Sequence, residues 1–597
     1  MTAKTAPSVR RRTSVALVAI LVVLLAFVVR LFDIQVVRAQ EHVEDSQTIA
    51  SMVQSDTVHG VRGSIVDDAG DVLASSTVRY IAVINPRHAQ DVTRHDDAGE
   101  EYVESWGHLA ERIGEIVDAS GSDIEKSVAD ALEANPNAQY LRIATGLTTE
   151  QYRDLLQLDA PMLSFETQKS RTYPNGAVAG NIVGFVGGDE EPLAGYERIE
   201  DGCLASEDGE ITYQVSGDHG VRIPGTTHSS PATDGGTLQL TIDTDLSWYL
   251  LQMLKEEVET QQALAGQIMV AEVATGEVKA AVEYPTVDPN DPSAAEPEDR
   301  GSRIFTTPFE PGSTFKALTT ATVLDQGAAT PLTHVSASGF EEFPNGARVG
   351  DSFSHPQYEY TLAGAMVDSS NVALSKIGEL VPAQTRQEYL ERFGVGTPTP
   401  IDFAGEEPGL LHPADTWDNQ TYYATTFGQA MLVTMPQVVS AYQTLANGGV
   451  RQPLHIVDGC TRADGTVEKE DLPEAERVIG EQAADQTVQI LENVAAEGAV
   501  SEQISIPGYR VAAKTGTAQK TDGSGGYKAN AYYTSLIGMA PAEDPEYIVM
   551  VTLDEPRRVT SSAATAPAFN KAMTQVLKTY RVMPSSEPFE PLPKFTD

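Results

Sequence analysis

Three short strings carry the side chains of this sequence that could do chemistry together. Residues 313–316 read Ser-Thr-Phe-Lys, residues 369–371 read Ser-Ser-Asn, and residues 514–517 read Lys-Thr-Gly-Thr. Each string is common by chance, but the three together in this order are not. A serine with nearby lysines is a recurring means of activating a hydroxyl as a nucleophile. The combination predicts an active site for acyl transfer through a serine.

The first string lies where a helix is expected to begin. Pro311 and Gly312 end the preceding loop, and apolar side chains then recur at helical spacing. A spacing of three places Lys316 one turn beyond Ser313 on the same helix face. A serine hydroxyl needs a base at neutral pH, and a lysine can serve if burial and a nearby cation lower its pKa. We expect Ser313 to be the nucleophile, Lys316 its base, and Lys514 the nearby cation.

The second string lies between two apolar stretches. Ser369 can relay a proton between the lysine and a departing amine. The Asn371 amide can hold a substrate carbonyl and the lysine together. The side chain of the middle residue, Ser370, is expected to point away from the chemistry. Taken alone, this string is more typical of a helix N-cap than of a catalytic site.

The third string lies in a strand predicted over residues 511–519. Gly516 within that strand indicates close approach by another backbone or by a ligand. An extended substrate could lie along the strand edge, where Thr515, Thr517 and Lys514 would gather its terminal carboxylate. The backbone amides of Thr517 and of the nucleophilic serine are candidates for an oxyanion hole. Taken alone, a polar edge with a lysine is also a device against edge-to-edge pairing.

Further strings outside these three extend over most of the chain. They are Arg-Gly-Ser-Ile-Val-Asp at 62–67, Arg-Thr-Tyr-Pro-Asn-Gly at 171–176, Thr-Ile-Asp at 241–243, Ala-Thr-Gly-Glu at 274–277, Gly-Gln at 428–429, Thr-Met-Pro-Gln at 434–437 and Ala-Asn-Gly-Gly at 446–449. With the three central strings, they resemble the class B, monofunctional penicillin-binding proteins. The resemblance implies a D,D-transpeptidase that cross-links peptidoglycan stem peptides on lipid-linked or nascent glycan. It also implies β-lactams as covalent inhibitors of Ser313 and no cofactor.

The resemblance leaves several roles open. It favours septal wall synthesis in cell division over elongation, and it implies a SEDS-type membrane glycosyltransferase and divisome proteins as partners. A D,D-carboxypeptidase or a β-lactamase would use the same strings with water as the acceptor, although β-lactamases are typically shorter and soluble. A non-enzymatic divisome scaffold or penicillin sensor with a silent site is a third alternative. The intact Ser313, Lys316, Asn371 and Lys514 argue against that alternative.

An apolar segment near the N-terminus predicts a membrane anchor. Residues 15–29 are wholly apolar, and three arginines at 10–12 precede them. We therefore expect a cytoplasmic tail over residues 1–13, a transmembrane helix over 14–36, and the catalytic part outside the cell membrane. The alternative is a cleaved signal peptide, with Val-Arg-Ala at 37–39 as its cleavage site. That site lies further beyond the apolar run than is usual.

The remaining chain predicts a multidomain α+β protein. Residues 37–235 mix strands with helices and resemble the family's pedestal, or dimerisation-type, domain. Residues 236–582 resemble the transpeptidase domain, an antiparallel sheet flanked by helices, and residues 583–597 are predicted to form a loose tail. The predicted elements are helices at 104–117, 123–132, 246–262 and around 569–580, and strands at 237–242, 532–539 and 547–553.

Composition excludes several other classes of protein. The chain carries 85 acidic and 41 basic residues, a net charge of −44, whereas nucleic-acid binding needs a basic surface. No His/Cys or carboxylate cluster has metal-ligand spacing. The two cysteines, Cys203 and Cys460, fall in different predicted domains, and we expect them to remain unpaired. An acidic balance of this size is typical of a solvated extracellular surface.

Overall fold

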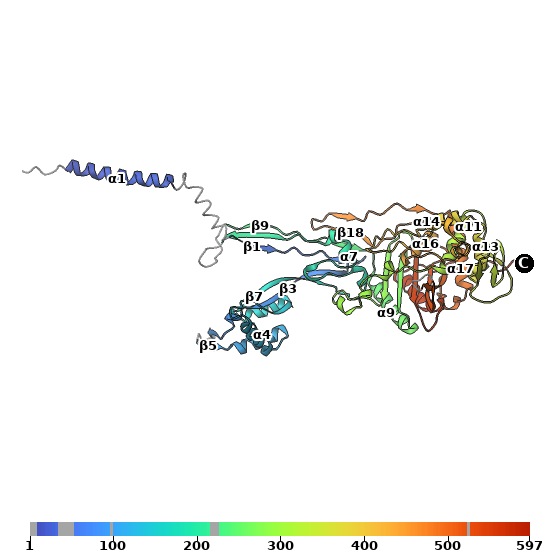
Figure 1. Cartoon of the computed structure of the whole chain (residues 1–597), viewed down its shortest axis with the longest axis horizontal. Helices are drawn as coiled ribbons and strands as arrows, with labels where there is room; N and C mark the ends of the chain where they lie inside the picture. Colours follow the sequence, from blue (N-terminus) through green and yellow to red (C-terminus); the bar gives the residue numbers. More distant parts are fainter. Residues whose placement is uncertain (1–8, 34–52, 96–99, 215–225, 522–525, 597) are drawn as a thin grey trace, which may run out of the picture. The chain divides into compact units, whose positions relative to one another are not determined.

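The computed structural model describes residues 9–33, 53–95, 100–214, 226–521 and 526–596 (Figure 1). The alternative cleavage site at 37–39 and most of the predicted cytoplasmic tail lie outside these residues. The chain divides into two compact units, one formed by Met1–Gly60 with Ser206–Asp234 and the other by Val61–Ala205 with Gly235–Asp597.

The first unit contains a long apolar helix and a small sheet. Helix α1 (Val9–Phe32) includes the window Ser14–Phe32, which has a mean hydropathy of 3.1 and no buried residue. Its 24 residues span about 36 Å, more than the roughly 30 Å of a bilayer's hydrocarbon core. The sheet is antiparallel in the order β1-β8-β9, with strands Val53–Val58, Gly209–Gln214 and His228–Ser230. The predicted apolar segment is therefore helical and long enough to cross a membrane.

In the second unit, one sheet joins the predicted pedestal to the predicted transpeptidase domain. Its order is β19-β18-β10-β2-β3-β6, and β7 pairs with β3. The strands are β2 (Ile65–Val66), β3 (Val72–Ile84), β6 (Leu141–Leu147), β7 (Leu163–Thr172), β10 (Thr237–Leu240), β18 (Val457–Thr461) and β19 (Val467–Lys469). Helices α3 (Trp106–Val117), α4 (Gly121–Ala134) and α5 (Thr149–Gln157) share a small apolar core with β3 and β6. The helices predicted at 104–117 and 123–132 are confirmed.

A buried carboxylate connects two of the strings that resemble the family. Glu197 lies in α7 (Gly195–Ile199), is fully buried, and accepts hydrogen bonds from Arg62 Nε at 2.9 Å and Arg171 Nε at 2.7 Å. Arg171 Nη1 also donates to the Gly63 carbonyl at 2.5 Å. Removing one partner from such a buried ion pair is strongly destabilising, because the remaining charge is left uncompensated. The three side chains therefore fasten the strings at 62–67 and 171–176 to each other.

The structure contradicts the prediction that the two cysteines remain unpaired. Cys203 at the end of α8 (Asp201–Leu204) and Cys460 in β18 form a disulfide, with their Cα atoms 6.1 Å apart. Cys460 lies opposite Leu238 in the β10–β18 pair, and the Cys203 carbonyl accepts a hydrogen bond from the Gly236 amide. The prediction was wrong because the shared sheet brings together chain segments from both predicted domains.

A five-stranded antiparallel sheet forms the centre of the predicted transpeptidase domain. Its order is β12-β11-β23-β22-β21, so β21 is an edge strand. The strands are β11 (Ala265–Glu272), β12 (Val278–Tyr284), β21 (Ala512–Thr521), β22 (Tyr527–Ala540) and β23 (Tyr547–Asp554). The predicted strands at 511–519, 532–539 and 547–553 are confirmed.

Helices cover both faces of this sheet. Ile268 of β11 faces one core, which it shares with α9 (Thr244–Gln261) and α19 (Ala566–Thr579), whereas the next residue, Met269, faces the other. That other core includes α11 (Lys316–Asp325), α16 (Met435–Ala446) and α17 (Glu481–Glu497), which lie together in Figure 1. The alternation follows from strand geometry, in which successive side chains point to opposite faces. The predicted antiparallel sheet flanked by helices is confirmed.

Shorter elements complete the described fold. The short strands are β4 (Val92–His95), β5 (Glu101–Glu104), β13 (His334–Ala337), β14 (Phe340–Glu342), β15 (Arg348–Gly350), β16 (Tyr358–Thr361), β17 (Val450–Arg451) and β20 (Glu476–Arg477). The short helices are α6 (Gly180–Val183), α10 (Arg303–Thr306), α12 (Leu362–Val367), α13 (Asn371–Gly378), α14 (Ala383–Arg392), α15 (Thr421–Ala424) and α18 (Ser501–Ile504).

For the described residues 583–596, the structure also contradicts the prediction of a loose tail over residues 583–597. The Ser585 amide donates to the Gly508 carbonyl at 3.0 Å, and the Leu592 amide donates to Asn493 Oδ1 at 2.7 Å. The Thr596 amide donates to the Glu359 carbonyl at 2.9 Å. The prediction was wrong because these partners lie far away in sequence and the segment itself has no periodic pattern.

Candidate active site

Ser313 lies in a tight turn at the start of a helix. It belongs to the 3-10 helix η6 (Gly312–Phe315), which leads directly into α11. Gly312 before it adopts a φ of 57°, in the left-handed region that favours glycine, and its amide donates to the Gly428 carbonyl at 2.8 Å. A Cβ on Gly428 would lie 2.1 Å from the Gly312 carbonyl oxygen. The two glycines therefore let this turn hold Ser313, half-buried, at the wall of a cleft.

The two lysines of the outer strings meet at one hydroxyl. Lys316 and Lys514 are both fully buried. Lys316 Nζ donates to the Ser369 carbonyl and, at 3.1 Å, to Ser369 Oγ. Lys514 Nζ donates to the same Oγ at 2.9 Å. Within the described part of the chain, no hydrogen bond joins Lys316 Nζ to the hydroxyl of Ser313.

Burial changes the protonation of both amines. It lowers the pKa of Lys514 to about 7. Burial, followed by the positive charge of Lys514, lowers the pKa of Lys316 well below its ordinary value, against an opposing effect of Asp351. Removing a cation from water disfavours its charged form, and a second cation nearby acts in the same direction. The lowered pKa favours the neutral form of the Lys316 amine, which is the form that can accept a proton.

The second string forms the junction between α12 and α13. Ser369 adopts a φ of 55°, a left-handed conformation that is uncommon for residues other than glycine. Ser370 caps α13, accepting from the Ala373 amide at 3.0 Å, and its side chain is fully buried. It therefore points away from the cleft, as expected. The Asn371 side chain lines the cleft and donates to the Gly350 carbonyl at 2.9 Å.

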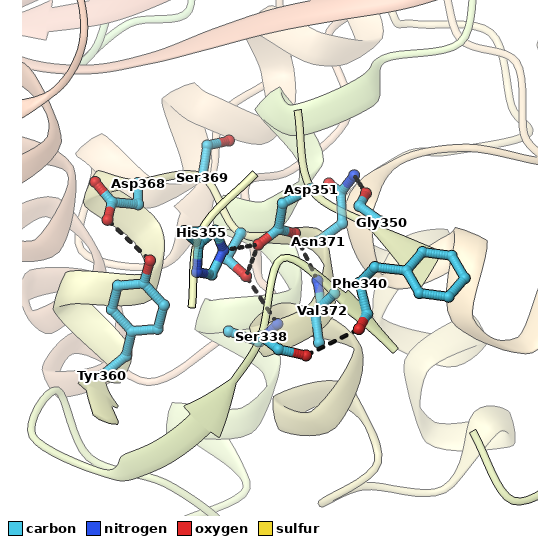
Figure 2. Close-up of polar contacts among 12 residues, drawn as sticks. Ser338, Phe340, Gly350, Asp351, His355, Tyr360, Asp368, Ser369, Asn371 and Val372 are labelled. Atoms are coloured by element: carbon cyan, nitrogen blue, oxygen red, sulfur yellow. Dashed lines mark hydrogen bonds and ion pairs between the residues drawn. The ribbon is translucent and has the colours of Figure 1, made fainter. Parts of the chain in front are cut away.

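A buried carboxylate that the sequence analysis missed supports this junction. Asp351 Oδ2 lies 2.9 Å from His355 Nε2 and accepts from Ser370 Oγ at 2.7 Å, while Oδ1 accepts from the Val372 amide at 3.0 Å (Figure 2). The Asp351 and His355 side chains are each 1% exposed. No motif marks these two residues, which lie in a short connection between strands. The contact of Asp351 with the second string arises only in the folded chain.

The third string lies on β21, at the edge of the five-stranded sheet. Thr515 and Thr517 line the cleft, and Thr517 Oγ1 accepts from the Ser562 amide at 3.1 Å. Gly516 faces the other way, and a Cβ there would lie 2.3 Å from Ser535 Oγ and 3.1 Å from the Pro311 carbonyl. The close approach predicted at this glycine is therefore made by the protein itself.

The cleft has a volume of 580 Å³. Residues from all three strings line it, namely Ser313, Ser369, Asn371, Lys514, Thr515 and Thr517. Lys316 contacts the cleft through Ser369, and Gly516 packs toward η6. A half-buried serine, a buried amine of lowered pKa and a strand edge in one cleft are the components of serine acyl transfer to and from a peptide.

Comparison with known proteins identifies the class of this fold and site. A family model described as the penicillin binding protein transpeptidase domain matches residues 266–574. A second model, the penicillin-binding protein dimerisation domain, matches residues 57–240. The dimerisation model matches the part of the chain predicted to be the pedestal, and the transpeptidase model matches the part predicted to be catalytic.

Individual relatives agree over nearly the whole chain. Penicillin-binding protein PbpB of Mycolicibacterium smegmatis is 31% identical over 96% of this chain and 91% of its own. Peptidoglycan D,D-transpeptidase FtsI of Escherichia coli is 28% identical over 88% of this chain and 84% of its own. The crystal structure of penicillin binding protein 3 of Mycobacterium tuberculosis with aztreonam matches with a TM-score of 0.68 and 26% identity, covering 89% of this chain and 99% of that one. This chain belongs to the class B penicillin-binding proteins, the D,D-transpeptidase family.

Proposed function

We propose that this chain is a septal peptidoglycan D,D-transpeptidase that acts through an acyl-enzyme on Ser313. The observation that supports the proposal most strongly is the shared contact at Ser369, whose hydroxyl oxygen accepts hydrogen bonds from two buried lysines. Burial lowers the pKa of both amines beside this serine-bearing cleft, which favours the neutral form that a general base needs. Similarity to the division-type transpeptidase FtsI supports the septal role.

The proposed reaction has two transfers. Ser313 Oγ forms an ester with the carbonyl carbon of the penultimate D-alanine of a donor stem peptide, and its proton passes to the neutral Lys316 amine. The bond to the terminal D-alanine breaks, and the departing amine takes a proton through the Ser369 hydroxyl. An amine from a neighbouring strand then attacks the ester, giving its proton back along the same groups. The new amide cross-links two strands and restores Ser313.

The proposed substrate contacts come from residues that line the cleft together with Ser369. Thr517 Oγ1 already accepts from the Ser562 amide, so its own hydrogen is available to donate to the terminal carboxylate of the donor. Thr515 and the Lys514 ammonium complete that carboxylate site. The Asn371 amide holds the peptide carbonyl, and the backbone amides of Ser313 and Thr517 form the oxyanion hole. Gly516 contributes by letting β21 lie close to η6.

β-Lactams are the proposed covalent inhibitors of the same serine. The ring mimics the donor terminus, and because it is opened and not cleaved away, its amine stays attached to the acyl-enzyme. Binding of aztreonam in the related Mycobacterium tuberculosis structure supports this assignment. We expect partners in the septal machinery, including a SEDS-type membrane glycosyltransferase, and a single-pass anchor through α1 with the catalytic part outside the cell.

Labelling with a fluorescent penicillin tests the catalytic assignment. Membranes that carry the wild-type chain should form a long-lived adduct on Ser313, and Ser313→Ala should not be labelled. Rapid release of hydrolysed penicillin would instead indicate a hydrolase of the carboxypeptidase or β-lactamase type. Recovery of the label on another residue would contradict the choice of nucleophile.

Two further measurements test the cellular role. A fluorescent fusion should concentrate at the septum, and a signal along the side wall would indicate the elongation role. Protease added outside intact spheroplasts should digest nearly the whole chain and spare an N-terminal fragment. A soluble mature protein that begins near Gln40 would indicate a cleaved signal peptide.

A further inference from the structure

The segment 592–596, here called the docked segment, lies against the helix that leads to Ser369. Its Phe595 forms an antiparallel bridge with Tyr360, and the Thr596 amide donates to the Glu359 carbonyl at 2.9 Å. Strand β16 pairs with β13 as well. The docked segment therefore adds backbone to this small sheet, where β16 runs into α12.

The docked segment contacts the N-terminus of α12 through Thr361. The Thr361 amide donates to the Lys594 carbonyl at 3.1 Å, and Thr361 Oγ1 donates to the Pro593 carbonyl at 2.6 Å. The same Oγ1 caps α12 by accepting from the Gly364 amide at 2.9 Å. Capping of the helix and docking of the segment thus depend on one hydroxyl.

The close contact between α12 and the docked segment requires a glycine at position 364. A Cβ at position 364 would lie 1.8 Å from the Lys594 carbonyl oxygen. Glycine inside a helix is less favourable than alanine. Its presence in the six-residue helix α12 is explained by the backbone that lies against it.

At its other end α12 is connected to the docked segment through Asp368. Lys594 Nζ donates to Asp368 Oδ1 at 2.6 Å, and the Tyr360 hydroxyl donates to Asp368 Oδ2 at 2.9 Å. Figure 2 shows Tyr360 directed at Asp368, next to Ser369. The Phe595 ring stacks on the buried Tyr360 ring, with centroids 5.4 Å apart. One carboxylate oxygen of Asp368 thus accepts from Lys594, and the other accepts from Tyr360, whose ring stacks on that of Phe595.

We infer that the docked segment is a positioning element of the active site, acting through Asp368 on Ser369. Ser369 has a left-handed backbone conformation, which is unfavourable for serine and persists only when contacts from the surrounding structure fix it. Asp368, which lines the cleft, is the neighbour that the docked segment fixes. The inference rests on the proposed function, in which the Ser369 hydroxyl connects the two lysines and relays a proton.

Two substitutions break the contact from opposite sides. Lys594→Met removes the ion pair with Asp368 and should lower the second-order rate of acylation by a fluorescent penicillin about fivefold. Lys594→Arg should restore most of that rate. Gly364→Ala should displace the Lys594 carbonyl and lower the rate about fivefold or more. Without a docked segment, Gly364→Ala would be neutral or stabilising, because alanine is the better helix former.

Matched controls and a combined variant separate positioning from general stability. Gly202→Ala lies in α8, where an added Cβ meets nothing within 4 Å, and Lys571→Met removes an exposed lysine paired with Glu256. Neither should change acylation. When residues 592–597 are deleted, acylation should fall at an unchanged folded fraction, measured by thermal unfolding. In that background Gly364→Ala should have no further effect.

The outcomes distinguish this inference from the proposed function. Acylation of Lys594→Met and of Gly364→Ala within twofold of the wild type would overturn the role of the docked segment and leave the proposed function intact. Loss in Lys594→Met that Lys594→Arg does not restore, or equal effects of Gly364→Ala with and without the segment, would overturn it as well. A wild-type chain that takes up no β-lactam would overturn both.

Discussion

The cluster around Glu197 and the cluster around Ser369 each bury two basic side chains. The clusters differ in the group that the two basic side chains share. Arg62 and Arg171 share one buried carboxylate. Lys316 and Lys514 share a hydroxyl, and neither forms an ion pair within the described residues. The first arrangement keeps its charges and fastens two segments together. The second lowers the pKa of both amines, which favours the exchange of protons near neutral pH.

The comparison explains why different residue types occupy the two clusters. Arginine stays charged under all ordinary conditions and offers donors in a rigid fork, so it suits a permanent contact with a carboxylate. Lysine changes its pKa readily on burial, so it suits a site in which a proton moves. The same degree of burial therefore serves structure in one cluster and chemistry in the other.

The largest effect is expected from Lys316→Met, which removes the amine of lowered pKa and keeps most of its apolar length. Acylation of Ser313 by a labelled penicillin should fall by about 10² to 10⁴, the usual contribution of general-base assistance. The fold and non-covalent binding of the substrate should persist, as measured by thermal unfolding and by competition binding. Acylation within a fewfold of the wild type, together with an inactive Ser369→Ala variant, would show that Ser369 takes the proton by another route.

Removal of the shared carboxylate tests the other cluster. Glu197→Gln leaves two buried arginines without a carboxylate between them and should lower the free energy of unfolding by about 3–5 kcal/mol. The acylation rate of the molecules that remain folded should be close to that of the wild type. Glu256→Gln is the control, because Glu256 is exposed and its pair with Lys571 should contribute little. Equal stability of the two variants would contradict the structural role of Glu197.

The sequence predicted the features of the structure that depend on neighbouring residues and missed those that depend on distant ones. Local patterns predicted the helix after Ser313, the strand that carries Lys514 and the order of the domains, because each rests on residues close together in sequence. The contacts of Asp351, the pairing of Cys203 and the docked segment were missed. They depend on partners brought together by sheets and helix ends, and no local spacing encodes them.

Lys514→Met should act in the opposite direction to Glu197→Gln. Because burial disfavours the lysine's charge, an apolar replacement should raise the free energy of unfolding at pH 7 by about 1–4 kcal/mol while acylation is lost.

In the folded chain the pKa of Lys514 is about 7, whereas an unfolded lysine has a pKa of about 10.4. Between these values the unfolded state binds more protons, so the wild type becomes more stable as pH rises. The advantage of the variant, measured by denaturant titration, should therefore shrink from pH 7 toward pH 10. A constant difference would show that the amine is charged when folded.

A smaller effect on acylation than that of Lys316→Met is expected from Thr517→Val, at the edge of the cleft. The two side chains are nearly equal in volume, and Thr517 is exposed, so the fold should be unchanged. If the hydroxyl donates to the carboxylate of the substrate, its loss removes a charge-assisted hydrogen bond of about 1.5–3 kcal/mol, or roughly ten- to a hundredfold in acylation. The Ser562 amide donates to Thr517 Oγ1 in the wild type. In the variant this amide would donate to water instead, because it is at the surface.

The loss of acylation in Thr517→Val should be smaller for a β-lactam whose carboxylate is esterified, because the hydroxyl then faces no charge. An equal loss for the free acid and the ester would mean that Thr517 shapes the strand edge without contacting the carboxylate.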